Sequence, residues 1–263
     1  MDLGLAGKVA FVAAASRGLG KACALGLARE GARVAMCSRS QASIDAAARE
    51  VAAETGSEVL ALAGDVRQAD VCERLVEQTV ERFGRLDVLI NNAGGPPLGS
   101  AWRMTDDQWQ AAFETNLMSA VRLSTAAIPH MKAAGAGRIV NITSTGVRQP
   151  LPNLVLSNAL RAAVVNFAKT LAIELAPDNI LVNNLGPGRI DTDRIKELDD
   201  DNARRWGVSV EEARTRQLES IPIGRYATPE EFANVAVFLA SARASYVTGQ
   251  TIMVDGASVR SIF

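Results

Sequence analysis

The sequence predicts an α/β fold in which a doubly wound sheet of parallel strands carries helices on both faces. Short apolar runs rich in Val, Ile and Leu alternate with longer helical patterns nearly to the end of the chain. Apolar runs of this kind are typical of strands buried on both faces of a parallel sheet. No repeat, low-complexity tract or linker interrupts the pattern, so we expect one domain spanning 1–263.

Each expected element has a local signal. The first helix, 18–30, has apolar residues at helical spacing and stops before Gly31, and the second, 41–54, is rich in alanine. The strand signature then recurs until a charged stretch breaks the alternation. The expected strands are 8–13, 33–37, 58–63, 86–90, 138–142 and 181–185, and the further helices are 106–132 and 160–175.

Charge and composition exclude several classes of function. The formal net charge is −1 with both signs interspersed, which argues against a nucleic-acid or membrane partner. No apolar run is long enough to span a membrane and the start has no signal-peptide pattern, so we expect a cytoplasmic protein. Cys23, Cys37 and Cys72 are too far apart for a C-x-x-C motif and are expected to be reduced thiols. A single histidine, His130, favours neither a metal site nor a Ser-His-Asp triad.

The turn after the first strand has the features of an anion site. It reads Ser16-Arg17-Gly18-Leu19-Gly20 and leads directly into a helix. At such a junction free backbone N–H groups and the positive end of the helix dipole face the same point. Gly18 and Gly20 permit close approach of the backbone to a ligand, so these five residues are predicted to bind the phosphates of a dinucleotide.

The end of the second strand indicates which nicotinamide cofactor is bound. An acid there hydrogen-bonds the ribose 2′-hydroxyl of NAD, whereas an arginine accommodates the 2′-phosphate of NADP. The strand ends in Cys37-Ser38-Arg39 without an acid, and Arg17 lies in the preceding turn. Two guanidinium groups and a hydroxyl suit a phosphate dianion, so NADP is favoured over NAD. The alternative is that both arginines are solvated surface residues.

Further motifs follow the later strands in order. They are Asp65-Val66, Asn91-Asn92-Ala93-Gly94, Asn116 in Phe-Glu-Thr-Asn-Leu-Met-Ser, Ser144, Pro187-Gly188 followed by Ile190 and Thr192, and Tyr246-Val-Thr-Gly-Gln. Together they resemble the short-chain dehydrogenase/reductase family over nearly the whole chain, particularly its 3-oxoacyl-acyl-carrier-protein reductases. The resemblance implies a Rossmann-type sheet of seven parallel strands in the order 3-2-1-4-5-6-7, and a homotetramer.

The resemblance also implies roles for single residues. Asn116 falls on an active-site Asn that holds a water in a proton relay, and Ser144 falls on the Ser that polarises the substrate carbonyl. The alternatives are a helix-bending core residue and an ordinary strand-end serine. The implied cofactor contacts are Asp65 and Val66 at the adenine, Asn92, Ala93 and Gly94 near the adenosine, and Pro187, Gly188, Ile190 and Thr192 towards the nicotinamide.

Three departures from the family pattern affect the chemistry. Ala13-Ala14 replaces the Thr-Gly that opens the glycine turn, and the Ala14 methyl crowds the backbone if φ must be positive. Ser157 stands where the family has its proton-donating Tyr, and Arg161 stands where it has Lys. An alkyl hydroxyl is a far weaker acid than a phenol, and Ser157 can alternatively be a small residue that only fills space. Arg161 can hydrogen-bond the cofactor ribose but cannot relay a proton.

Residues 193–220 are strongly charged and interrupt the alternation of strands and helices. They form either a solvated pair of surface helices or a lid over a cleft, since long excursions in compact folds are often lids. As a lid, the segment has Trp206 and Leu218 as its apolar underside.

Three functions therefore stay open. The first is an NADP-dependent reductase of a small carbonyl substrate, such as a 3-oxoacyl thioester, that uses Ser144, a water and Arg161 in place of the usual acid. The second is a nucleotide-binding protein of the same fold with little dehydrogenase activity, acting as a sensor or partner subunit. The third is an enzyme that uses the cleft for non-redox chemistry such as dehydration.

Overall fold

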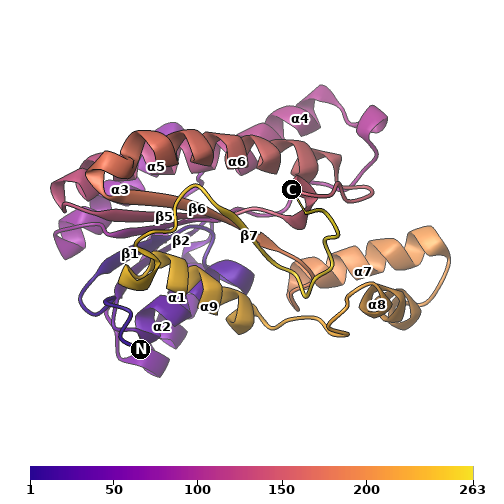
Figure 1. Cartoon of the computed structure of the whole chain (residues 1–263), viewed down its shortest axis with the longest axis horizontal. Helices are drawn as coiled ribbons and strands as arrows, with labels where there is room; N and C mark the ends of the chain where they lie inside the picture. The colour runs from indigo at the N-terminus through magenta and orange to yellow at the C-terminus, as the bar shows by residue number, and fades with distance from the viewer. Residues whose placement is uncertain (263) are drawn as a thin grey trace.

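A computed structural model describes residues 1–262 and shows a central sheet between two layers of helices (Figure 1). The sheet has seven strands in the order β3-β2-β1-β4-β5-β6-β7, and all neighbouring strands run parallel. The strands are Val9–Val12 (β1), Arg33–Ser38 (β2), Val59–Ala63 (β3), Val88–Asn91 (β4), Gly137–Ile142 (β5), Ile180–Pro187 (β6) and Thr251–Val254 (β7). The predicted fold class and strand order are confirmed.

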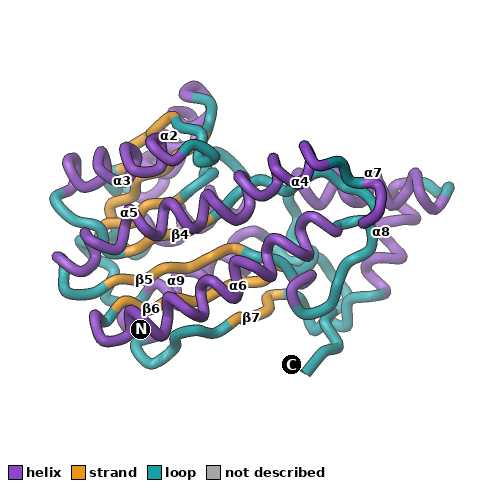
Figure 2. The backbone as a smooth tube through the Cα atoms, turned by 90° about the horizontal axis from the view of Figure 1, so that it is seen from above, coloured by secondary structure: helices purple, strands orange, loops and turns teal. Residues whose placement is uncertain are grey.

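Two groups of helices cover the two faces of the sheet. One group packs with β1 and β2 around a core that contains Leu27, Ile44 and Phe232, and the other around a core that contains Leu75, Leu123 and Ala168. The first group is α1 (Gly18–Arg29), α2 (Gln41–Thr55) and α9 (Pro229–Ala240), and the second is α3 (Ala69–Phe83), α5 (Ser119–Ala133) and α6 (Val155–Leu175). Figure 2 shows α3, α5 and α6 side by side along the sheet.

Strand β1 shows why apolar and polar residues do not alternate along the strands. Val9 and Phe11 belong to one core, Ala10 and Val12 belong to the other, and all four are fully buried. Successive side chains point to opposite faces of a sheet, so a strand that is covered on both faces needs apolar residues at every position.

The expected helix 106–132 is not continuous. It consists of α4 (Asp106–Phe113), a π-helical segment at Glu114–Met118, and α5. A π segment accommodates one extra residue within a helix and occurs frequently at functional sites, and this one carries Asn116. Helix α6 also begins earlier than the expected 160–175, so that Ser157 lies in its first turn.

The charged stretch folds as α7 (Asp193–Trp206) and α8 (Val210–Glu219), which lie together beyond one end of the sheet (Figures 1 and 2). A small apolar cluster of Ile195, Ile221 and Tyr226 holds them, and Leu218 packs against it. Trp206 is outside this cluster and stacks near Arg216 instead. No helix within residues 1–262 has the length and apolar character to cross a membrane.

Candidate active site

The glycine turn after β1 holds a strained backbone conformation. Ala14 has a φ of 47°, in the left-handed region that costs a residue with a Cβ about 1–2 kcal/mol. Its carbonyl accepts a hydrogen bond from Asn92 Nδ2 at 3.2 Å. A Cβ at Gly20 would lie 2.5 Å from the same carbonyl oxygen, so position 20 requires glycine. The turn therefore keeps its shape although Ala14 stands where the family pattern has Gly.

The N-terminus of α1, directly after this turn, has no side-chain cap on its free backbone N–H groups. Arg17 is the N-cap residue, and no side chain caps the helix. The unpaired N–H groups and the helix dipole suit a phosphate. Thr192 lies opposite, because its Cγ2 would be 3.8 Å from a Cβ at Gly18. Arg17 itself is exposed and forms an ion pair with Asp193 at 3.4 Å.

The residues expected at the adenosine end lie past β2 and β3. Ser38 donates to the Ser40 carbonyl at 3.1 Å, and the exposed Arg39 makes no hydrogen bond or close ion pair with residues 1–262. Asp65 is bonded by Arg67, and that hydrogen bond, with a smaller contribution from the charge of Arg39, lowers the pKa of Asp65. Arg39 thus remains available beside the adenosine end of the cleft.

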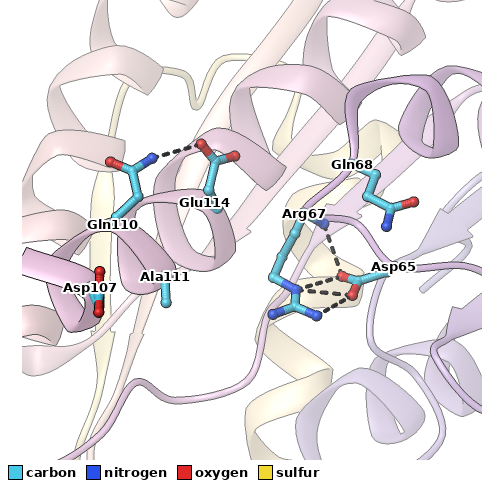
Figure 3. Close-up of a pocket in the computed structure, with 7 residues that line it drawn as sticks. All are labelled: Asp65, Arg67, Gln68, Asp107, Gln110, Ala111 and Glu114. Carbon is cyan, nitrogen blue, oxygen red and sulfur yellow. Dashed lines mark hydrogen bonds and ion pairs between the residues drawn. The ribbon is translucent and has the colours of Figure 1, made fainter.

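A hollow of about 370 Å³ lies next to Asp65, between the loop after β3 and α4 (Figure 3). Its lining residues are Asp65, Arg67, Gln68, Asp107, Gln110, Ala111 and Glu114. Gln110 donates to Glu114, and Arg122 pairs with Glu114 at 2.6 Å. None of the proposed catalytic residues lines this hollow, and of the predicted cofactor contacts it includes Asp65.

The loop after β4 is held by donors from three different elements. Asn116 Nδ2 donates to the Gly94 carbonyl at 2.8 Å, while its Oδ1 is buried and has no hydrogen-bond partner among the described residues. Arg161 of α6 donates to the Ala93 carbonyl at 3.4 Å. Arg194 of α7 donates to the Pro96 carbonyl at 2.8 Å. The loop therefore joins Asn116 of the π segment, Arg161 of α6 and Arg194 of α7.

Ser144 lies just past the end of β5, where the carboxyl ends of the parallel strands converge. Its Oγ accepts the Gly146 N–H at 3.0 Å, which leaves its own proton available for donation. The loop that follows is fixed by Asn158, whose side chain exchanges two hydrogen bonds with the backbone of Leu151. Asn158 was not singled out from the sequence.

Ser157 and Arg161 share a buried face of α6, with exposed fractions of 7% and 8%. Ser157 makes no side-chain hydrogen bond within residues 1–262. Arg161 donates to the Ile142 carbonyl at 2.5 Å and has no carboxylate partner in the described chain. Burial, with a smaller contribution from the charge of Arg194, lowers the pKa of Arg161 to about 10.

Neither tyrosine replaces the absent phenol at position 157. Tyr226 donates to the buried Asp199 at 3.1 Å, and burial raises the pKa of this phenol to about 12. Arg189 pairs with the same carboxylate at 3.2 Å. Tyr226 is therefore one of the residues that hold α7 in place. Tyr246 is fully exposed. Within residues 1–262, no group of three His, Cys, Asp or Glu side chains is arranged to hold a metal ion.

Helix α7 contacts three loops at the carboxyl edge of the sheet. Asp193 pairs with Arg17 of the glycine turn, and Arg194 reaches the loop after β4. Asp201 accepts from Asn153 at 3.0 Å, in the loop between β5 and α6. Arg194 was missed in the sequence because it stands in a run of charged residues that reads as solvent-exposed. The sequence did contain one indication of its position near the site, because Arg194 stands two residues after Thr192, at the start of a helix.

Comparisons with known proteins find similarity over nearly the whole chain. A family model described as enoyl-(acyl carrier protein) reductase matches residues 13–257. The chain is 36% identical over 252 residues to the 3-oxoacyl-[acyl-carrier-protein] reductase FabG of Chlamydia muridarum, covering 96% of this chain and 97% of that protein.

Solved structures are similar over nearly the whole chain. L-sorbose reductase from Gluconobacter frateurii, complexed with NADPH and L-sorbose, has a TM-score of 0.94 and 36% identity, with 100% of both chains covered. A single-residue variant of the actinorhodin polyketide ketoreductase, solved with NADPH, has a TM-score of 0.91 and 37% identity, with 95% of this chain and 96% of that chain covered.

Proposed function

The chain belongs to the short-chain dehydrogenase/reductase family, and from that membership we propose that it is an NADPH-dependent reductase of a small ketone. Its similarity to 3-oxoacyl-acyl-carrier-protein reductases and ketoreductases supports this reaction class. The single observation that carries the proposal is the convergence of Ser144, Asn116 and Arg161 beside an uncapped helix N-terminus.

The described residues fit NADPH along the carboxyl edge of the sheet. The free N–H groups at the start of α1 suit the pyrophosphate, and Gly20 keeps that surface open. Arg39, with Ser38 beside it, suits the 2′-phosphate, because its guanidinium makes no hydrogen bond within the described chain. Gly188 lets the loop after β6 lie against Asp255, since a Cβ there would be 2.6 Å from the Asp255 Cα.

Ser144 and Arg161 stabilise the negative charge that develops on the substrate oxygen. When bound, NADPH supplies a hydride to the carbonyl carbon. The Ser144 hydroxyl can donate to the substrate oxygen because its own acceptor site is occupied by Gly146. Arg161 has five N–H groups and uses two of its nitrogens on backbone carbonyls, which leaves donors for the cofactor ribose and the substrate.

Water takes the place of the missing phenol as the proton donor. Ser157 is too short and too weak an acid to serve alone. The buried Asn116 Oδ1 needs a donor, and a water bound there would donate to it next to the loop that Arg161 contacts. Helices α7 and α8 cover this region as a lid, which we infer from the three contacts of α7 with the surrounding loops.

The test is NADPH consumption with acetoacetyl-coenzyme A and small ketones, in the wild type and in Ser144→Ala. Loss of the polarising hydroxyl is expected to lower kcat by about 10²–10³-fold. The matched control is Thr170→Ala, which removes an exposed hydroxyl further along α6 and should leave kcat unchanged. Equal rates for both variants would contradict the role of Ser144.

The absence of a phenol at position 157 favours one second candidate, a nucleotide-binding protein of the same fold with little turnover. Tight NADPH binding by fluorescence, without NADPH consumption on any carbonyl compound, would support that candidate over the reductase. Turnover of substrate without change in nicotinamide absorbance would instead indicate non-redox chemistry.

A further inference from the structure

We propose that the ketone substrate is a 2-oxo acid whose carboxylate is held between Arg161 and Arg194. This inference rests on the proposed reductase function and adds the substrate class to it. It also gives Arg194, which lies on α7, a part in substrate selection.

The first observation is a buried guanidinium without an anion. Arg161 is 8% exposed and its hydrogen bonds go to the carbonyls of Ile142 and Ala93, which carry no net charge. Burying an arginine without a counter-ion costs far more than burying a lysine ammonium that can lose its proton, since Arg stays protonated. The depressed pKa of Arg161 has the same cause. A buried arginine of this kind is suited to an anionic ligand.

The second observation is a second guanidinium at the same loop. Arg194 lies against Gly95, where a Cβ would be 2.5 Å from its Nε, and donates to the Pro96 carbonyl. Its charge is close enough to Arg161 to lower the pKa of that residue. Glu197 pairs with Arg194 at 3.0 Å, but this carboxylate is 56% exposed and screened by water.

The cofactor does not supply the missing negative charge. Its nicotinamide ribose carries hydroxyl groups, and its phosphates belong at the glycine turn and at Arg39, away from the α6 face. Two arginines donate to carbonyls of one short loop, residues 93–96. Their positive charges are therefore suited to a negatively charged group of the substrate. Planar guanidinium groups match the two oxygens of a carboxylate.

The position of Arg161 indicates where the carboxylate lies on the substrate. Arg161 is one helical turn from Ser157, on the face of α6 that carries the reaction chemistry in this family. In the proposed arrangement a carboxylate bound there is adjacent to the reacting carbonyl, as in a 2-oxo acid. In the reaction the carbonyl carbon gains a hydride from NADPH, the π electron pair moves to the oxygen, and water gives that oxygen a proton. The products are a 2-hydroxy acid, NADP and hydroxide, which solvent neutralises.

The first experiment measures binding without turnover. Oxamate is an inert mimic of a 2-oxo acid, and ethyl oxamate is its neutral ester. By calorimetry with NADP present, oxamate is expected to bind the wild type about 10–100-fold more tightly than the ester. In Arg194→Gln, which keeps a donor for Pro96 but removes the charge, this ratio should fall at least tenfold, and Arg194→Lys should recover part of it.

The control is Lys196→Gln, which removes one positive charge from an exposed position on the same helix. It should keep the wild-type preference for oxamate. Equal binding of acid and ester by the wild type, or equal loss of preference in Arg194→Gln and Lys196→Gln, overturns the proposal. The second of these outcomes would mean that the preference for oxamate depends only on the total positive charge of α7 and not on the position of Arg194.

The second experiment separates this proposal from the reductase function. NADPH consumption is measured with 2-oxo-4-phenylbutanoate and with its ethyl ester. We expect kcat/KM to favour the acid in the wild type and this preference to fall at least tenfold in Arg194→Gln. Turnover of the ester but not of the acid would refute the anion site while the reductase function stands. Selective oxamate binding without any turnover would refute the reductase function while the anion site stands.

Discussion

The glycine turn and the buried face of α6 both depart from the pattern that the sequence resemblance implies, but they depart in different ways. In the turn, Ala14 replaces a glycine and still adopts a φ of 47°. On α6 the backbone is an ordinary helix, and Ser157 and Arg161 change the side chains that the helix presents. One region keeps its geometry at a cost in strain, whereas the other keeps its geometry and changes its chemistry.

The difference follows from what each region contributes to the proposed function. The turn acts through backbone N–H groups, so a changed side chain is tolerated where the backbone conformation survives. The α6 face acts through side-chain protons and charges, so a well-formed helix does not by itself preserve the function. Substitutions on α6 should therefore affect the reaction rate, whereas substitutions in the turn should affect the free energy of unfolding and the affinity for NADPH.

The largest effect is expected from restoring the family residues on α6. The double change Ser157→Tyr with Arg161→Lys should raise the rate on neutral ketones and acetoacetyl-coenzyme A by about 10²–10⁴-fold, since a positioned acid contributes that much. Ser157→Tyr alone should give less, because the phenol needs the neighbouring ammonium to lower its pKa. The measurement is NADPH oxidation, with thermal unfolding as a check on overpacking.

A double mutant that folds, binds NADPH and is slower than the wild type would contradict this interpretation of the α6 face. It would show that Ser157 and Arg161 serve a different mechanism, and that the α6 face has not simply lost an acid.

The next effect concerns cofactor choice at the adenosine end. Arg39→Ala should weaken NADPH binding by about 1–3 kcal/mol and leave NADH nearly unchanged, because only NADPH carries the 2′-phosphate. Fluorescence titration measures both constants. Arg49→Ala, at an exposed position on α2, is the matched control and should alter neither. Equal losses for both cofactors in Arg39→Ala would remove Arg39 from the phosphate site.

A smaller effect is expected from relieving the turn. Ala14→Gly removes a left-handed strain of about 1–2 kcal/mol but adds about 0.5–1 kcal/mol of chain entropy to the unfolded state. The free energy of unfolding should therefore be unchanged or rise by up to about 1.5 kcal/mol, and NADPH affinity should be equal or better. Denaturant melts and calorimetry check the two quantities. A clear loss of affinity would mean that the turn depends on the Ala14 methyl.

The smallest expected effect is at a thiol next to the turn. Burial raises the pKa of Cys37 to about 12, although a hydrogen bond with the Ala14 backbone opposes the shift. At about pH 8 the native thiol is therefore neutral and inaccessible, and iodoacetamide should label Cys37 only after unfolding. Mass spectrometry of native and unfolded samples gives the answer. Native labelling that NADPH suppresses would reveal a turn that opens in solution.

The sequence predicts the sheet well because its signal is local. Apolar strands and the glycine turn predict a parallel sheet, and the family resemblance implies seven strands in the order that the structure has. The sequence does not reveal the π segment at 114–118, because one extra residue in a helix barely changes the apolar periodicity of 106–132.

Long-range partners are also invisible in the sequence. Asp199, Asp200 and Asp201 are consecutive and look alike, yet Asp199 is 1% exposed and bonded by Tyr226, whereas Asp200 is exposed. Arg194 stands in the same charged stretch and reaches Pro96, nearly a hundred residues earlier. The proposed roles of Ser144, Asn116, Ser157 and Arg161 stay predictions until the variants are measured.

In the proposed lid, the three contacts of α7 with the surrounding loops set how often the helix can detach from them. Weak polar contacts at a surface contribute about 0.5–1 kcal/mol each, so three of them leave the detached arrangement populated at about 1–10%. Because α7 shares the buried Asp199 and the Ile195 cluster with α8 and residues 221–226, these parts should swing as one body. Such motions take microseconds to milliseconds, so the product can depart many times faster than the chain unfolds.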